Sequence, residues 1–321
     1  MKAIAAIALG ISALTSTVVA QAAGYPDKPV RIVVPYQPGG TVDLVARVLA
    51  QSLTEQTGTQ FIVDNRSGAS GAIGTENVAR SPADGYTLLL QSPTMVANPL
   101  INKKVTYDPV RDFRPIALLG SVPMVLTVHP SIPAKNLKEF ADLAKATPQK
   151  YSFGTSAVGS PMHLAEEAIK RDSKIDIPII VYRGTAGALN DVLGGQVSGM
   201  IDAIPSSAPH IAGGKLKALA VTTNHRVKSL PGVPTVAESG FPGFDMGSWY
   251  GLWAPQGTPD DVGKKLETMV QKAMASKFVQ ERLEPQNFEV NALLGNDFAG
   301  FVAKQLANYS RIVKDGNITA E

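Results

Sequence analysis

Short apolar runs alternate along the chain with longer segments of helical periodicity. Val30–Val34 is a β-branched run closed by Pro35, and residues 41–56 then repeat apolar side chains at helical spacing. A strand at 61–64, a helix to about residue 80 and a strand at 86–90 continue the order. This βαβαβ order predicts an α/β fold with a largely parallel sheet.

A second series of the same kind begins after Pro123. Strands are expected at 125–128, 151–153, 177–182, 197–201 and within 211–221, and helices at 137–146, 161–170 and 186–193. Residues 229–248 are rich in proline and glycine, which predicts an irregular connection. Behind it we expect strands at 249–254 and 288–290 and helices at 259–276 and 298–314, all returning to the first unit.

The two series predict two lobes. The chain crosses from one lobe to the other twice, near residues 122 and 250. Lobe 1 is expected to contain residues 23–122 and 250–321, and lobe 2 residues 123–249. Two crossings form a hinge, and a hinged pair of α/β lobes encloses a ligand in the cleft between them.

The first 22 residues have the pattern of a secretory signal peptide. Lys2 precedes an apolar stretch at 3–14, and Ala20-Gln21-Ala22 places small residues at a cleavage site. A membrane anchor is the alternative, but the apolar run is shorter than the ~20 residues that span a bilayer. We therefore expect an exported, periplasmic protein of about 299 residues after cleavage, 321 minus 22.

The composition excludes several classes of function. The chain has no cysteine, so it has no disulfide, thiol nucleophile or thiolate metal site. Its 30 basic and 27 acidic residues give a formal charge of +3, and no basic run exceeds two residues. Such a balance lacks the electrostatic signature of a nucleic-acid-binding protein.

The loop at 35–41 is the first candidate for a binding site. Gly39 and Gly40 precede a predicted helix and let the backbone approach a ligand closely, while Thr41 and Asp43 can cap the helix. Free N–H groups and the helix dipole at such a start favour a carboxylate, phosphate or sulfate. An ordinary strand-to-helix turn that needs glycine is the equally open alternative.

The loop at 65–74 is the second candidate. Its three glycines, Gly68, Gly71 and Gly74, do not form a dinucleotide or P-loop motif. Their amides can form a nest for an anion. Alternatively, the last two let the next helix pack closely on the sheet.

Further polar residues follow the other predicted strands, where open α/β sheets bind ligands. Arg183 is one of them, and a guanidinium can hold a carboxylate through two parallel hydrogen bonds. Asp202 can accept from a ligand hydroxyl or amine, or cap the next helix. The full set comprises Ser92, Thr155, Ser156, Tyr182, Arg183, Gly184 and Asp202.

The sequence contains few residues in patterns typical of an enzyme active site. It has no GxSxG or HExxH motif. His163 with Glu166 and Glu167 is at most half of a zinc site, because a third ligand is missing. Ser160 before Pro161 has the pattern of a helix N-cap rather than of a nucleophile. We expect no catalytic residue, no metal and no cofactor.

With these loops identified, the chain resembles the Bug family, the extracytoplasmic receptors of tripartite tricarboxylate transporters. The resemblance runs from about Tyr25 to Lys314 and depends on the order and spacing of several short motifs. These are residues 25–31, 33–35, 38–43 with 46–47, 65–74, 84–88, 107–109 with 112–113, 182–184, 213–216 with 218–221, and 231–235.

The resemblance implies a two-lobed periplasmic binding protein fold, type II-like, that closes on its ligand. It also implies that the first two loops take one carboxylate, partly through water, and that the second lobe sets specificity. The residues so implied for the carboxylate are Tyr36, Pro38, Gly39, Gly40 and Ser67-Gly68-Ala69-Ser70-Gly71, to which we add Asp43. Ser67, Ser70 and Arg183 depart from the residues frequent in the family.

The resulting hypothesis is a monomeric periplasmic receptor for a small aliphatic or aromatic carboxylate. It would deliver this ligand to the membrane subunits of a tripartite tricarboxylate-type transporter. A periplasmic hydrolase or lyase on the same fold, and a sensor that presents its ligand to a signalling receptor, are the alternatives.

Overall fold

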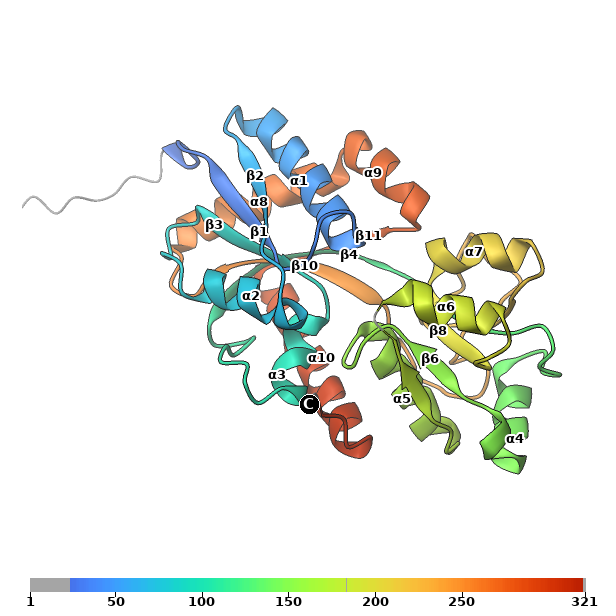
Figure 1. Ribbon diagram of the computed structural model, residues 1–321. Coiled ribbons are helices and arrows are strands. Elements are labelled where there is room, and N and C mark those ends of the chain that lie inside the picture. Colours follow the sequence, from blue (N-terminus) through green and yellow to red (C-terminus); the bar gives the residue numbers. More distant parts are fainter. Residues whose placement is uncertain (1–23, 183, 320–321) are drawn as a thin grey trace, which may run out of the picture.

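The computed structural model describes residues 24–182 and 184–319 and contains two β-sheets side by side (Figure 1). The first sheet has the strand order β11-β4-β10-β3-β1-β2. Its strands are β1 (Val30–Val34), β2 (Phe61–Asn65), β3 (Thr87–Gln91), β4 (Phe113–Val122), β10 (Ser248–Pro255) and β11 (Glu289–Leu294).

The first sheet is mixed, so the expectation of a largely parallel sheet is wrong. Strand β1 pairs in parallel with β2 and β3, as the βαβαβ order predicts. Strand β10, however, returns from the second sheet and runs antiparallel to both β3 and β4, and β11 is antiparallel to β4. The apolar pattern of a buried strand is the same in either direction, so it did not reveal this.

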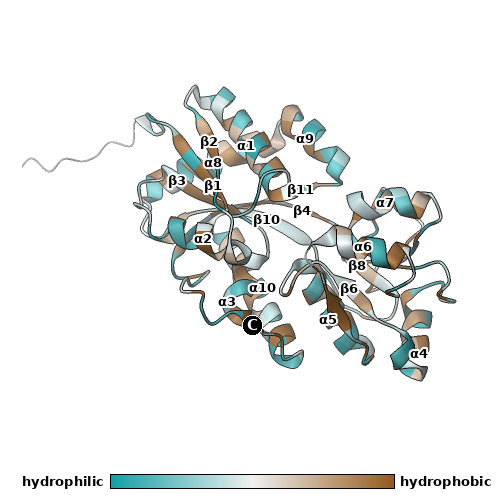
Figure 2. Cartoon of the chain, viewed as in Figure 1, coloured by the Kyte–Doolittle hydropathy of each residue, from teal (hydrophilic) through white to brown (hydrophobic). Residues whose placement is uncertain are grey.

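Helices cover both faces of the first sheet. Successive residues of β1 point to opposite faces: Ile32 packs in one apolar cluster with α1 (Thr41–Thr57), α8 (Asp260–Ala275) and α9 (Lys277–Leu283). Val33 packs in the other cluster, with α2 (Ala72–Ala79), α3 (Thr94–Ile101) and α10 (Gly295–Asp315). Burial on both faces explains why the strands are nearly continuous apolar runs (Figure 2).

The second sheet has the order β7-β6-β8-β5-β9 and is also mixed. Strands β6, β7 and β8 are parallel neighbours, whereas β5 is antiparallel to β8 and β9. Its strands are β5 (Met124–Val128), β6 (Phe153–Thr155), β7 (Ile179–Val181), β8 (Gly199–Ala203) and β9 (Lys217–Val221). Its helices are α4 (Leu137–Ala146), α5 (Pro161–Ser173), α6 (Thr185–Leu193) and α7 (Ile204–Ala212).

The chain passes between the sheets at two places. Strand β4 ends at Val122 in the first sheet, and β5 begins at Met124 in the second. The return runs through residues 222–247, which hold no helix or strand, and enters β10. Helix α10 lies against both α3 and α5. The lobe boundaries at 122 and 250 remain predictions, as does the signal peptide, which lies outside the described residues.

Four elements were absent from the sequence prediction: α3, β4, α7 and α9. Helix α7 contains two prolines, Pro205 and Pro209, which masked its helical pattern. Strand β4 carries Pro115 and a glycine, Gly120, within its length. None of the helices among residues 24–182 and 184–319 has the length and apolar character needed to cross a bilayer.

Candidate functional site

The loop between β1 and α1 exposes its two glycines to solvent. Gly39 adopts a left-handed φ of 97°, and Gly40, the N-cap residue of α1, makes no side-chain cap hydrogen bond. Both glycines are exposed, and a Cβ placed on either would have no heavy atom within 4 Å. Of the two residues predicted to cap α1, Asp43 accepts an amide, that of Gly39, which lies one residue before the N-cap. The next amides of the helix start can therefore serve an external acceptor.

The Asp43 side chain holds this loop through hydrogen bonds. Its buried carboxylate accepts hydrogen bonds from the Gly39 amide at 3.0 Å, Arg47 Nε at 2.9 Å and Asn65 Nδ2 at 2.9 Å. Burial opposes its ionisation, but the hydrogen bonds from these three donors outweigh burial and lower the pKa of Asp43. The carboxylate is occupied by the protein itself, so we assign it to shaping the loop.

The second loop, residues 65–74, is tied to the first through a side-chain hydrogen bond. Gln37 Nε2 donates to Ser67 Oγ at 2.7 Å. From Gly68 to Gly71 every residue has a positive φ, between 48° and 137°. Ala69 and Ser70 are exposed. These residues form a tight turn in which the Gly71 amide donates to the Gly68 carbonyl at 2.9 Å. A nest formed by the remaining amides stays a prediction.

The third glycine of the second loop has a packing role. A Cβ on Gly74 would lie 2.7 Å from the Arg66 carbonyl oxygen and 2.8 Å from Pro35 Cβ. The alternative of close helix packing therefore holds for Gly74. Gly71 is also crowded, since a Cβ there would lie 2.9 Å from Gln91 Nε2.

A hydroxyl cluster joins the 35–41 loop to the residues that follow β3. The Tyr36 hydroxyl lies 3.1 Å from Ser92 Oγ and also contacts Thr94 Oγ1. The Gln91 carboxamide oxygen accepts from the Ser92 amide at 2.8 Å. Burial raises the pKa of Tyr36, so its hydroxyl keeps its proton. The structure thus gathers the residues predicted for the first lobe at one edge of the first sheet.

The predicted residues of the second lobe gather at the ends of β6, β7 and β8. The Tyr182 amide donates to the Thr155 carbonyl at 2.9 Å, and the Gly184 amide donates to the Ser156 carbonyl at 2.9 Å. The Tyr182 hydroxyl is already engaged, because it donates to Asp191 Oδ2 at 2.6 Å. Arg183 lies outside the described residues.

Asp202 faces the start of α7. Its carboxyl oxygens accept from the Ala203 amide at 2.8 Å and from the hydroxyls of Ser206 and Ser207. Burial raises the pKa of Asp202, against the lowering effect of these donors. Of its two predicted roles, the structure shows contacts with the following helix.

The conceivable zinc half-site on α5 is not assembled. His163 Nδ1 accepts the Gly159 amide at 3.1 Å, and Glu166 Oε1 accepts the Ile201 amide at 2.9 Å inside the sheet. His163 Nε2 lies 3.9 Å from Glu167 Oε1. No group of three or more His, Cys, Asp or Glu suited to a metal occurs within the part of the chain that the structure describes. Ser160 caps α5 as predicted, accepting the His163 amide at 3.2 Å.

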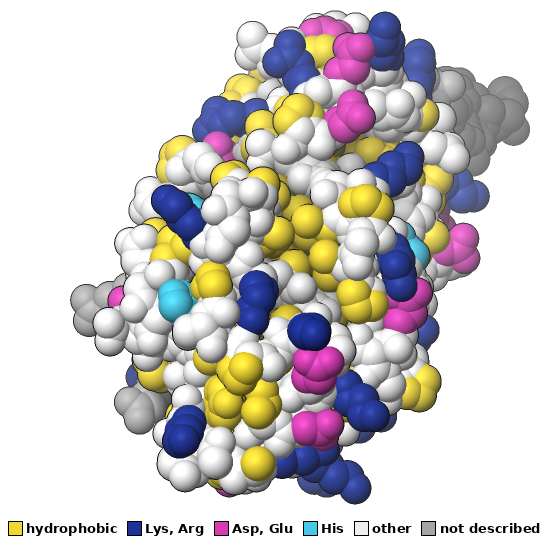
Figure 3. All heavy atoms as spheres, turned by 90° about the vertical axis from the view of Figure 1, so that its right-hand side faces the viewer, with side chains coloured by type: hydrophobic (Ala, Val, Ile, Leu, Met, Phe, Trp, Pro, Cys, Tyr) yellow, Lys and Arg dark blue, Asp and Glu magenta, His cyan; other side chains and the backbone are white. Residues whose placement is uncertain are grey.

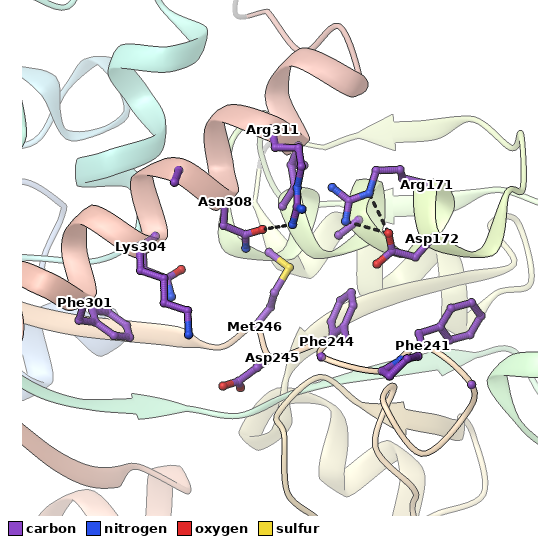
Figure 4. A pocket seen from close by; sticks show the side chains of 17 residues that line it. Arg171, Asp172, Phe241, Phe244, Asp245, Met246, Phe301, Lys304, Asn308 and Arg311 are labelled. Carbon is purple, nitrogen blue, oxygen red and sulfur yellow. Dashed lines mark hydrogen bonds and ion pairs between the residues drawn. The ribbon is translucent and has the colours of Figure 1, made fainter.

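A hollow of about 820 Å³ lies elsewhere, between α5, the 240–246 segment and α10 (Figure 4). None of the predicted binding residues lines it. Figure 3 shows the face of the molecule on the side of the second sheet, where basic and acidic side chains are interspersed. We take the glycine loops as the candidate site, because exposed glycines at the start of α1 lie beside the Tyr36–Ser92 hydroxyl cluster.

Comparison with known proteins identifies the chain's relatives. Residues 45–318 match the model of the tripartite tricarboxylate transporter family receptor, TctC. Protein BugT of Bordetella pertussis is 35% identical over 294 residues, 91% of this chain and 90% of its own length.

Two solved structures are similar throughout. Periplasmic binding protein BugD has a TM-score of 0.77 at 37% identity, covering 92% of this chain and 100% of that one. Rpa4515 of R. palustris, solved with adipate, has a TM-score of 0.79 at 35% identity, covering 92% and 99%. These comparisons confirm the predicted two-lobed periplasmic binding protein fold and the predicted family. The chain belongs to the tripartite tricarboxylate transporter receptors, a family of periplasmic solute-binding proteins.

Proposed function

We propose that the protein captures a small carboxylate in the periplasm, as a monomer and without turnover, after export by its N-terminal signal peptide. It then delivers this ligand to the membrane subunits of a tripartite tricarboxylate-type transporter. Family membership supports the receptor role, and the adipate in the Rpa4515 structure supports the class of ligand.

One observation carries the assignment of the site. The 17-residue helix α1 begins at two exposed glycines and has no side chain capping its first amides. The positive end of a helix favours an anion there. The 67–71 loop adds further backbone amides, and the Tyr36–Ser92 pair adds hydroxyls.

The loops of the second sheet supply the opposite wall in this proposal. Thr155, Ser156, Tyr182 and Gly184 lie at neighbouring strand ends, and sequence places Arg183 between the last two. Closing the hinge would bring this wall to the ligand and bury its second end.

The chemistry of α5 supports binding rather than catalysis. Burial lowers the pKa of His163 to about 4, and Lys170 contributes in the same direction. A base this weak, with Nδ1 already bonded to the Gly159 amide, is poorly suited to take a proton near neutral pH.

A thermal-shift screen of mono-, di- and aromatic carboxylates tests the function. Ligand binding stabilises the folded state by RT ln(1 + [L]/Kd), about 2.7 kcal/mol at 100 times Kd. At least one acid of the panel should raise the melting temperature. A panel of dozens at millimolar concentration without effect would contradict the proposal.

Gly40→Val tests the location. The backbone of Gly40 (φ −82°, ψ 171°) suits a β-branched residue, and a Cβ there meets open space. The fold should therefore survive while the anion loop is crowded, and affinity should fall at least tenfold. Gly232→Val, at another exposed glycine without neighbours within 4 Å, is the matched control. Equal affinities of the two variants would place the site elsewhere.

A further inference from the structure

Two buried polar groups behind the loops of the second sheet have no hydrogen-bond partner among the described residues. One is Oε2 of Glu166 on α5, and the other is the Thr155 hydroxyl at the end of β6. Both side chains belong to residues that are 0% exposed. A buried polar group without a partner is destabilising, so two such groups require an explanation.

The hydrogen bond of the other Glu166 oxygen indicates which of Glu166 and Thr155 is the donor. Oε1 accepts the Ile201 amide at 2.9 Å, whereas no donor of normal geometry faces Oε2. Burial raises the pKa of the Glu166 carboxyl well above its usual value, although the Ile201 amide and the Thr155 hydroxyl act to lower it. A carboxyl that is completely buried, with no ion pair to a cation among the described residues, favours its neutral form. Because Oε1 accepts from Ile201, the proton then lies on Oε2, with the Thr155 oxygen as the nearby acceptor.

We propose that Glu166 is a positioning residue whose carboxyl donates a hydrogen bond to the Thr155 hydroxyl, leaving that hydroxyl to donate to an acceptor group on the ligand. A hydroxyl has one proton, so accepting from Glu166 directs this proton away from the protein interior. Thr155 is buried in this structure, so the contact requires the residues that cover it to move, or one bridging water molecule.

The proposal rests on the proposed function and predicts what the second end of the ligand carries. A carboxylate or carbonyl at the second end of the ligand accepts a hydrogen bond from the Thr155 hydroxyl. An ammonium group can only donate, so it cannot pair with this hydroxyl. Asp202 nearby does not reverse this preference, since its oxygens already accept from Ala203, Ser206 and Ser207.

The test uses three matched series of linear acids from four to seven carbons: monocarboxylates, α,ω-dicarboxylates and ω-amino acids. Affinities are measured by calorimetry. The protein should bind its best dicarboxylate at least tenfold more tightly than the ω-amino acid of equal length. Glu166→Leu and Thr155→Val should each weaken that dicarboxylate about tenfold or more, while monocarboxylate affinity changes less than twofold.

Conservative variants separate hydrogen bonding from simple packing. In Glu166→Gln the amide accepts from Ile201 and donates to Thr155 as the neutral acid does, so dicarboxylate affinity should be retained. Thr155→Ser should likewise retain it. Glu167→Gln, on the next position of α5, is the matched control and should leave all three series unchanged.

The outcomes distinguish this proposal from the receptor function. Equal weakening of monocarboxylates and dicarboxylates in Glu166→Leu, or a loss in Glu166→Gln as large as in Glu166→Leu, would overturn the positioning role and leave the receptor intact. A preference for ω-amino acids would overturn it as well. If no carboxylate bound the native protein, the proposed function itself would fall first.

Discussion

Replacing His163 by asparagine should remove a large part of the acid sensitivity of the fold. His163 is 6% exposed, and its Nδ1 accepts the Gly159 amide. Burial, followed by the charge of Lys170, lowers its pKa from 6.5 to about 4. The folded state therefore binds this proton more weakly than the unfolded state does. The stability that the neutral ring contributes is complete above pH 6.5 and is lost as the pH falls toward 4.

The size of the effect follows from this shift. With a pKa of 6.5 in the unfolded state and about 4 in the folded state, protonation costs roughly 2 kcal/mol of unfolding free energy at pH 5 relative to pH 7. The cost rises to about 3 kcal/mol below pH 4. In His163→Asn the side-chain oxygen still accepts from Gly159 but does not titrate, so this pH-dependent cost should disappear.

Urea denaturation at pH 7 and pH 5 measures the effect. The native protein should lose about 2 kcal/mol more than His163→Asn over this range. Titration of Glu166 and Asp202 cancels, because both proteins carry them. His129→Asn, at a partly exposed histidine, is the control for loss of an imidazole. A difference below about 0.5 kcal/mol would refute the assignment of a buried neutral ring.

Three further predictions concern the loops and a cap. Gly71→Ala forces a Cβ to 2.9 Å from Gln91 Nε2 at a φ of 90°, so ligand affinity should fall and the melting temperature should drop; an unchanged affinity would exclude this loop from the site. Asp43→Ala removes the acceptor of the Gly39 amide. It should lower the ligand affinity measured by calorimetry more, in free energy, than it lowers the stability measured by thermal melting without ligand. Asn136→Ala deletes the cap of α4, whose side chain accepts the Glu139 amide, and should cost about 1 kcal/mol of unfolding free energy without altering affinity.

The sequence was informative where one residue type decides the local structure. β-Branched residues closed by Pro35 define β1, which spans Val30–Val34 as predicted. The helical pattern at 137–146 predicts α4, which spans Leu137–Ala146 as predicted, and the structure adds its cap at Asn136. Glycine and proline spacing likewise located the first two loops, because few other residues adopt the left-handed φ found at Gly39 and Gly68.

The remainder depends on contacts between distant segments. The antiparallel insertion of β10 between β3 and β4 leaves no trace in local periodicity. The sequence placed Glu166 only in a conceivable half-site for zinc, beside His163 and Glu167. Its burial against Ile201 becomes visible only when α5 is packed on β8.

The central claim is that backbone amides at the start of α1 and in the 67–71 loop hold a carboxylate between the two sheets. A crystal structure of the protein with the best acid of the thermal-shift screen tests it most directly. We predict one carboxylate within hydrogen-bond distance of these amides, directly or through one water molecule. The acid lodged instead in the hollow beside Phe244 and Arg311, or recovered as a chemically altered product, would contradict it.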